Sequence, residues 1–314
     1  MRIDIKECAG LLKEKNNIVI LTHAHPDGDT LGSGFALCRA LMKLGKNARV
    51  INDDEIPKKY AYMFDDLQFS DFSPEYVVAV DVATENLLGS IQDDYKGKID
   101  LCIDHHLTNA EYADNLLLED VPAACEIMYQ VILELGVDID KKIADCLYTG
   151  ISTDTGCFRY ASTTAQSYRF AAELIDLGAE NGLINRAMFE TKSKTYVNLE
   201  KLCLNGLELF CNDRVAVITV TQEMYAETGS TEQETEAIAP LTRQIEGVEV
   251  GITIKEKKDK TCKASLRTYE SVNAAELARC FGGGGHSQAA ACRFDCSVEE
   301  AKKLLIEKCR ELLK

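Results

Sequence analysis

The amino-acid sequence predicts an α/β protein with two domains: a first domain built on a parallel sheet and a smaller α/β domain after it. In the first part of the chain, short apolar runs rich in valine and isoleucine alternate with stretches of helical periodicity. These runs are almost continuously apolar, which is typical of strands buried on both faces of a parallel sheet. Later in the chain, apolar and polar residues alternate with period two. The length of 314 residues also suits two domains.

The elements of the first domain follow from these patterns. Strands are expected at residues 16–23, 47–53, 75–81 and 98–104. Helices are expected at residues 4–15, 31–44, 122–136, 138–151 and 165–177. Gly45, Gly136 and Gly178 stand where three of these helices end, a position in which glycine commonly stops a helix. We therefore assign residues 1–184 to the first domain.

The second domain begins after a mixed helical segment, residues 185–205, which we interpret as a linker. Residues 213–221 and 248–268 alternate with period two, and the second stretch resembles a β-hairpin whose turn is the charged run KEKKDK. We interpret that run as a solvated turn. The remaining elements are a helix, a run of four glycines, an apolar segment and a terminal helix, at residues 273–281, 282–285, 287–294 and 297–313. Residues 206–314 therefore form the smaller α/β domain.

The composition limits the partners and the compartment. A net charge of −16 is poorly suited to long nucleic acids, which are bound by rows of lysine and arginine, so we expect no binding of long duplexes. The 13 cysteines show no zinc-finger spacing, and we interpret them as reduced core residues of a cytoplasmic protein. The N-terminal segment lacks the apolar core of a signal peptide. No stretch approaches the roughly 20 apolar residues of a membrane span, so we expect no membrane association.

Histidines and aspartates gather in a few short motifs. All five histidines lie in THAHPDGD, in DHH or directly after the four glycines. Aspartates stand at the ends of four apolar segments of the first domain, at Asp27 and Asp29, Asp81, Asp104 and Asp154. Because the carboxyl ends of parallel strands share one edge, where ligands bind, we expect these side chains to converge. A single aspartate in such a place could instead cap the following helix, but four with histidines beside them favour a shared site.

The chemistry of these groups favours a divalent metal site. Carboxylates and imidazoles without thiolates suit Mn²⁺, Mg²⁺ or Fe²⁺ better than structural zinc. Six such groups are too many for one ion but fit two ions with one bridging carboxylate. Phosphoryl-transfer enzymes use paired ions, roughly 3.5–4 Å apart, to activate a water molecule and stabilise the leaving oxygen. Asp81 stands alone after its strand, which makes it the candidate bridge.

The glycine run FGGGGHSQAAA is the second chemical signal. Glycine lets the backbone approach an anion closely, and successive N–H groups can form an anion-binding concavity. His286 adds a further donor, and Arg267 lies nearby in the expected strand KASLRT. Because arginine can bind a phosphate through two hydrogen bonds, the two features together favour a phosphate site. A flexible loop is the alternative interpretation of the glycines alone.

With these residues in view, the sequence resembles the DHH-family phosphoesterases of the nanoRNase type, whose C-terminal, DHH-associated domain ends in GGGGH. The resemblance covers nearly the whole chain and is carried by THAHPDGDTLGS (22–33), VVAVD (77–81), IDHH (103–106), GISTDTGCFRY (150–160), SLRT (265–268) and FGGGGHSQAAA (281–291). It implies two Mn²⁺ ions, or Mg²⁺ or another divalent ion in their place. The implied ligands are His23, Asp27, Asp29, Asp81, His105 and Asp154.

The resemblance also implies roles for other residues. Asp104 would orient the site from behind the ligands, and His106 would contact the scissile phosphate or the base beside it. The terminal phosphate would be bound from the second domain by Arg267, Gly284, Gly285 and His286. His25 occupies a variable position and is treated as a non-ligand.

The implied activity is hydrolysis of short oligoribonucleotides to 5′-mononucleotides and removal of the 3′-phosphate of pAp (adenosine 3′,5′-bisphosphate). Substrate would lie in a cleft between the two domains, and the protein would be a monomer or a homodimer. The nearest alternative is a phosphodiesterase acting on cyclic di-AMP or pApA. A RecJ-like exonuclease and a manganese pyrophosphatase fit the short, acidic chain and its GGGGH domain less well. A non-catalytic nucleotide sensor is the alternative of another class, and it need not bind two Mn²⁺ ions without nucleotide.

Overall fold

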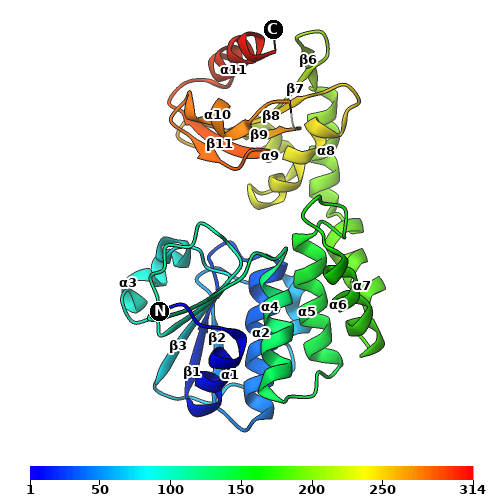
Figure 1. Cartoon of the computed structure of the whole chain (residues 1–314). Helices are drawn as coiled ribbons and strands as arrows, with labels where there is room; N and C mark the ends of the chain where they lie inside the picture. The colour runs from blue at the N-terminus through cyan, green and yellow to red at the C-terminus, as the bar shows by residue number, and fades with distance from the viewer. Residues whose placement is uncertain (270, 314) are drawn as a thin grey trace. The chain divides into compact units, whose positions relative to one another are not determined.

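The computed structural model describes residues 1–269 and 271–313 of the chain. It divides the chain into two compact units, Met1–Thr191 and Lys192–Lys314, each with its own sheet and hydrophobic core (Figure 1). In the part of the chain that is described, no helix is both long enough and apolar enough to cross a membrane.

A five-stranded parallel sheet forms the centre of the first unit, in the order β2-β1-β3-β4-β5. The strands are β1 (Ile18–Leu21), β2 (Ala48–Ile51), β3 (Tyr76–Val80), β4 (Leu101–Asp104) and β5 (Asn115–Leu118). The predicted parallel sheet and its first four strands are confirmed. Strand β5 was not expected from the sequence.

Helices cover both faces of this sheet, because side chains alternate along each strand. Ile18 and Ile20 of β1 lie in the core under the long helices, whereas Val19 and Leu21 lie in the core on the opposite face. The first face carries α1 (Ile5–Glu14), α2 (Gly28–Lys43), α4 (Ala124–Leu135), α5 (Lys141–Asp154) and α6 (Ala165–Asp176). The other face carries the 3₁₀ helix η2 (Glu85–Ile91) and α3 (Gln92–Tyr95). A further 3₁₀ helix, η1 (Lys58–Met63), packs on the first face. The five predicted helices are confirmed.

The strand order places a topological switch point between β1 and β3. From β1 the chain passes to β2 on one side, and it then returns across β1 to β3 on the other side. In open α/β sheets a crevice forms outside the carboxyl ends of the strands at such a point, and ligands bind there. The motifs that follow β1 and β3 therefore meet at the position where this architecture forms a site.

The second unit contains a six-stranded mixed sheet in the order β10-β11-β9-β8-β7-β6, in which β7 and β8 pair in parallel and the other neighbours pair antiparallel. Its strands are β6 (Glu208–Phe210), β7 (Val215–Val220), β8 (Val250–Glu256), β9 (Cys262–Thr268), β10 (Gly284–Gly285) and β11 (Ala289–Phe294). Its helices are α8 (Lys194–Asn205), α9 (Gln222–Thr228), the 3₁₀ helix η4 (Gln233–Gln244), α10 (Ala274–Arg279) and α11 (Val298–Leu312). The expected hairpin is the β8–β9 pair, with the charged run at its turn. Helices α10 and α11 cover one face, and α8, α9 and η4 cover β7 and β8 on the other.

The segment expected to be a linker, residues 185–205, is divided between the two units. Helix α7 (Asn181–Asn185) and the π-helix η3 (Arg186–Glu190) belong to the first unit. Helix α8 belongs to the second unit, because its Leu199 packs in one apolar cluster with Ile218 and Val220 of β7. The boundary between the units therefore follows Thr191.

Candidate metal centre

The loop from β1 to α2 supplies His23, Asp27 and Asp29. Asp27 is the N-cap of α2: its Oδ1 accepts hydrogen bonds from the backbone N–H groups of Asp29 (3.0 Å) and Thr30 (3.1 Å). His23 Nδ1 lies 2.8 Å from the Ala24 carbonyl oxygen, and its Nε2 lies 3.8 Å from Asp27 Oδ1. Asp27 can therefore be a helix cap and a metal ligand at the same time, because its carboxylate caps α2 and also faces the His23 imidazole.

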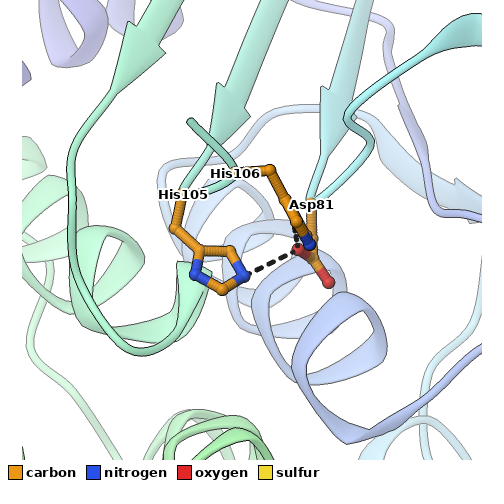
Figure 2. A group of neighbouring side chains, drawn as sticks. All are labelled: Asp81, His105 and His106. Atoms are coloured by element: carbon orange, nitrogen blue, oxygen red, sulfur yellow. Dashed lines mark ion pairs between the residues drawn. The ribbon is translucent and has the colours of Figure 1, made fainter. Parts of the chain in front are cut away.

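Asp81 lies at the centre of the cluster, directly after β3. Its Oδ2 is 3.7 Å from His23 Nε2, and its Oδ1 is 3.4 Å from His105 Nε2 and 3.5 Å from His106 Nδ1 (Figure 2). The side chain is 2% exposed, and the backbone has φ +57°, in the left-handed region that is uncommon for residues other than glycine. Strain of this kind persists where the surrounding structure over-determines it, commonly at functional sites.

The DHH motif at the end of β4 is arranged around Asp104, which is completely buried. Asp104 Oδ1 accepts hydrogen bonds from the backbone N–H groups of His105 (2.8 Å) and His106 (3.2 Å) and from His106 Nδ1 (2.8 Å). Its Oδ2 accepts from Asn109 Nδ2 at 2.6 Å. Burial acts to raise the pKa of Asp104, but the hydrogen bonds from His106 and Asn109 outweigh it and hold that pKa below its usual value. Asp104 is thus a fully engaged carboxylate that orients the two histidines.

The Nε2 atom of His105 faces three carboxylates. Its Nδ1 lies 2.9 Å from the Val121 carbonyl oxygen, so that Nδ1 carries the proton and donates. Its Nε2 lies 3.4 Å from Asp81 Oδ1, 3.6 Å from Asp154 Oδ2 and 3.9 Å from Asp29 Oδ2. Among the described residues, both His105 Nε2 and Asp81 Oδ1 are buried without a hydrogen-bond partner. Two orphaned atoms that face each other in this way are the arrangement that a cation between them would satisfy.

Asp29 and Asp154 complete the cluster from two helices. Asp29 is completely buried, and it accepts hydrogen bonds from Ala124 N (2.6 Å) and Cys125 N (2.9 Å) at the N-terminus of α4. Asp154 is the last residue of α5, so it reaches the cluster from a helix end and not from a strand. Helices α2 and α5 can approach closely here because Gly150 has no side chain: a Cβ there would lie 2.6 Å from Asp29 Oδ1.

The clustered carboxylates favour a bound cation. Burial, together with the charges of Asp29 and Asp27, raises the pKa of Asp81 well above its usual value. Burial and the same two neighbours also raise the pKa of Asp154. The pKa of His105 is raised as well: burial acts to lower it, but Asp29 and the hydrogen bond to Val121 prevail. Carboxylates with imidazoles are the ligands that Mn²⁺ and Mg²⁺ accept, so the residues present fit a divalent cation.

The six residues expected as ligands come together in overlapping groups. Among the described residues, the structure forms three groups, and within each group the ligand atoms lie within 4.8 Å of one another. The groups are His23, Asp27 and Asp81; Asp29, His105 and Asp154; and Asp81, His105 and His106. Asp81 and His105 each belong to two groups, which makes one continuous cluster. His25 lies apart: its ring is 80% exposed and its Nδ1 is 2.8 Å from Asp54 Oδ2. The second unit holds the expected phosphate residues Arg267, Gly284, Gly285 and His286.

Several groups that shape this site were not expected. The Val121 carbonyl orients His105, Asn109 supports Asp104, and the N-terminus of α4 binds Asp29. A helix starting near residue 122 was predicted, and a helix N-terminus is a general anion site. Nothing in the sequence pairs that terminus with Asp29, which is 95 residues away from Ala124.

Metal binding is expected to stabilise the chain more as the pH rises. Because the pKa values of Asp81 and Asp154 are raised in the folded chain, protons stabilise the metal-free fold, and this contribution is lost as the pH rises through those pKa values. A cation must displace the same protons. We expect Mn²⁺ at a hundredfold excess over its dissociation constant to add about 2.7 kcal/mol per ion at about pH 7.5, and less at about pH 5.

Thermal unfolding with Mn²⁺ and with a chelator, at both pH values, measures this effect. An equal shift in Tm at the two pH values would contradict competition between protons and metal.

Comparison with known proteins agrees with this site. Residues 17–151 match the DHH family, N-terminal domain, and residues 212–314 match the DHHA1 domain. The chain is 31% identical over 304 residues to a Thermus thermophilus protein named bifunctional oligoribonuclease and PAP phosphatase NrnA, with 94% of this chain and 90% of that protein covered.

Solved structures share the fold. An exopolyphosphatase-related protein from Bacteroides fragilis superimposes with a TM-score of 0.89 at 25% identity, over 98% of this chain and 97% of that chain. RecJ from Thermus thermophilus, solved in complex with Mn²⁺, gives a TM-score of 0.59 at 14% identity, over 98% of this chain and 54% of that chain. With the two domain matches and the Thermus relative, these findings confirm the resemblance seen in the motifs: the chain belongs to the DHH family of phosphoesterases, which are metal-dependent hydrolases.

Proposed function

We propose that this phosphoesterase degrades short oligoribonucleotides to 5′-mononucleotides, removes the 3′-phosphate of pAp, and uses two Mn²⁺ ions. The observation that carries the proposal is the position of Asp81 between His23 and His105, with its two oxygens facing different imidazoles. The chemistry that two divalent cations supply in such a site is activation of a water molecule and stabilisation of the leaving oxygen. The name of the Thermus relative supports the two substrates.

The residues that would hold the ions are the six of the cluster. His23, Asp27 and Asp81 form one group, and Asp29, His105 and Asp154 form the other, with Asp81 shared through its contact with His105. His106 has a different part: Asp104 accepts its Nδ1–H, which fixes the ring and leaves Nε2 to meet a phosphate oxygen or the base beside it. Asp104 keeps this orientation because both of its oxygens are already occupied.

The second unit would bind the terminal phosphate. Arg267 of β9 stands opposite Ala289 of β11, and the His286 backbone N–H donates to the Ala289 carbonyl at 2.8 Å, so Arg267 and His286 flank one small residue. Gly285 has φ +145°, and a Cβ there would lie 2.5 Å from the Ala289 carbonyl oxygen, so no side chain fits. Arginine, histidine and an open glycine backbone are together suited to an anionic phosphate.

Replacement of Arg267 with Ala is expected to raise KM about tenfold or more, with a smaller change in kcat, because a charge-assisted hydrogen bond to the bound phosphate is lost. Initial rates with pAp and with pApA measure both constants. An unchanged kcat/KM for both substrates would contradict the proposed phosphate site.

The remaining parts of the proposal follow from charge and composition. A chain with net charge −16 would not hold long duplexes, and the many cysteines without metal-binding spacing suit a reducing cytoplasm. We take the two functional domains as residues 1–184 and 206–314, and we expect both to contribute to substrate binding. We expect a monomer or a homodimer.

A product-resolved assay tests the function. Purified protein with Mn²⁺ would receive equal concentrations of pApA, pAp and cyclic di-AMP, with the Asp81→Ala protein as control. Rapid loss of pApA and pAp, with cyclic di-AMP nearly intact, is the expected result. Rapid opening of cyclic di-AMP would instead assign the protein to turnover of a signalling nucleotide. No turnover of any of the three by a Mn²⁺-binding protein would overturn the proposed activity.

A further inference from the structure

Both backbone polar groups of His23 are bound by side chains from other elements of the first unit. Its N–H donates to Thr30 Oγ1 at 3.4 Å, and its carbonyl oxygen accepts from Asn52 Nδ2 at 2.7 Å. Thr30 lies in α2, and Asn52 directly follows β2. His23 is already past the end of β1, so its backbone groups need partners outside the sheet. Two side chains therefore fix the backbone of this expected ligand.

The Thr30 hydroxyl also reaches the segment that carries Asp81. Thr30 is completely buried, and its Oγ1 donates to the Val80 carbonyl oxygen at 3.2 Å. A hydroxyl has one proton to donate and lone pairs with which to accept, so it can bond to Val80 and His23 together. On the other side of the same peptide, the Asp81 N–H donates to the Ile103 carbonyl at 2.9 Å. Fixing this peptide from α2 and from β4 restrains the left-handed backbone of Asp81.

The contacts of Thr30 coincide with one of the ligand groups. Its backbone N–H donates to Asp27 Oδ1 at 3.1 Å. With the two bonds of its hydroxyl, Thr30 is thus bonded to each member of one group, or to the peptide beside it: His23, Asp27 and Asp81. The second group is fixed from elsewhere, by the N-terminus of α4 and by the Val121 carbonyl.

Asn52 is held in a single orientation by its partners. Its Nδ2 donates one proton to the His23 carbonyl and the other to Thr22 Oγ1 at 2.8 Å, and its Oδ1 accepts from the Asp54 backbone N–H at 2.9 Å. Because a carbonyl oxygen cannot donate, a rotated amide would lose these bonds. The end of β2 therefore holds the His23 carbonyl through a fixed donor.

We propose that Thr30 and Asn52 are positioning residues for the cation of the group formed by His23, Asp27 and Asp81. They keep His23 Nε2 and Asp81 Oδ2 facing each other, 3.7 Å apart, before a cation binds. A ligand pair that is fixed in advance binds more tightly, because less conformational freedom is lost on binding. The inference rests on the proposed two-ion site, and it assigns the support of one ion to α2 and the end of β2.

Replacement of Thr30 with Val tests the role of the hydroxyl, since it keeps the branched shape of the side chain. We expect one of two Mn²⁺ ions to bind about tenfold more weakly and the other to change less than about twofold. Titration calorimetry of Mn²⁺ into the metal-free protein measures both affinities without substrate. Thr30→Ser restores the hydroxyl and should restore the affinity. Asn52→Leu, which cannot donate to His23, should weaken the same ion.

Thr253→Val is the matched control. Thr253 lies in β8 of the second unit, is completely buried, and has no hydrogen-bond partner for its hydroxyl among the described residues. The same change there should leave both Mn²⁺ affinities unchanged. Thermal unfolding of each metal-free variant checks that it is folded. Equal weakening of both ions by Thr30→Val would overturn the inference, because a general loss of structure acts on both ligand groups.

Two backgrounds identify the ion that Thr30 supports. In an Asp27→Asn protein, whose first group is already incomplete, Thr30→Val should change the affinity of the remaining ion less than about twofold. In an Asp154→Asn protein, it should still weaken the remaining ion about tenfold. Unchanged affinities for both ions in the Thr30→Val single variant would overturn this inference alone. A wild-type chain that binds fewer than two Mn²⁺ ions would refute the proposed two-ion site, and this inference with it.

Discussion

Replacement of Asp81 with Ala is expected to lower kcat by at least about a thousandfold while the chain remains folded. Changing a residue that only supports a metal ligand lowers metal affinity or activity by about 10–100-fold. Asp81 is itself an expected ligand, and its two oxygens face His23 and His105, so we expect a larger loss of activity. Loss of this side chain would separate the two ligand groups and leave each ion with an incomplete set.

Stability should respond in the opposite way from activity. Burial and neighbouring acids raise the pKa of Asp81, so its ionised form destabilises the metal-free fold above that pKa. The metal-free Asp81→Ala protein should therefore have a Tm equal to or above that of the metal-free wild type, and it should lose most of the Mn²⁺-induced rise. Turnover of pApA and thermal unfolding with and without Mn²⁺ measure both effects. Asp176→Asn, an exposed aspartate at the end of α6, is the control and should match the wild type. An Asp81→Ala protein that binds Mn²⁺ and cleaves pApA normally would contradict the central role of Asp81.

Replacement of Asp29 with Ala is expected to reduce both activity and stability. Asp29 accepts the backbone N–H groups of Ala124 and Cys125, and α4 has no side-chain cap of its own, since its N-cap is Ala123. Asp29 is therefore the cap of a helix that lies far away in the sequence. Without Asp29, two buried N–H groups lose their acceptors. Each loss lowers the free energy of unfolding by about 1–3 kcal/mol.

Removal of the buried Asp29 charge raises stability by less than loss of its hydrogen bonds lowers it. Burial raises the pKa of Asp29, so removal of the carboxylate recovers part of the loss, and we expect a net destabilisation of about 1–3 kcal/mol. Asp29→Asn keeps one acceptor oxygen and should lose less stability than Asp29→Ala, while kcat/KM falls by at least about a hundredfold in both. Urea unfolding of the metal-free proteins and initial rates with pApA measure the two quantities. A metal-free Asp29→Ala protein as stable as the Asp81→Ala protein would contradict the capping role.

The aromatic residues after Asp154 show how far a motif can be interpreted without its surroundings. By residue type alone, Phe158 and Tyr160 could each stack on a base or pack in the core. Phe158 packs between Tyr148 and Tyr168, with ring centroids 6.2 Å and 5.2 Å away, so it belongs to an aromatic cluster. Tyr160 is 53% exposed, with its ring against Gly156. Residue type alone does not distinguish them, because exposure depends on the neighbours that the fold brings.

The sequence by itself determined the helices, the strands and the residues of the candidate site. Strands and helices followed from periodicity, since burial of one face imposes a period of two or 3.6 on any segment. The aspartates after β1, β3 and β4 were recognisable because parallel strands end at one edge. His23, Asp81 and His105 could therefore be named before their positions were known.

Only the tertiary structure decided how these groups meet. The order β2-β1-β3-β4-β5 put the motifs after β1 and β3 at one switch point. Packing of α2 against α5 at Gly150 brought Asp154 in from a helix end, and the N-terminus of α4 fixed Asp29. The same packing set Thr30 and Asn52 on either side of the His23 backbone. Local patterns do not record such contacts, because pairing between segments far apart depends on the packing of the whole unit, and no single segment carries that information.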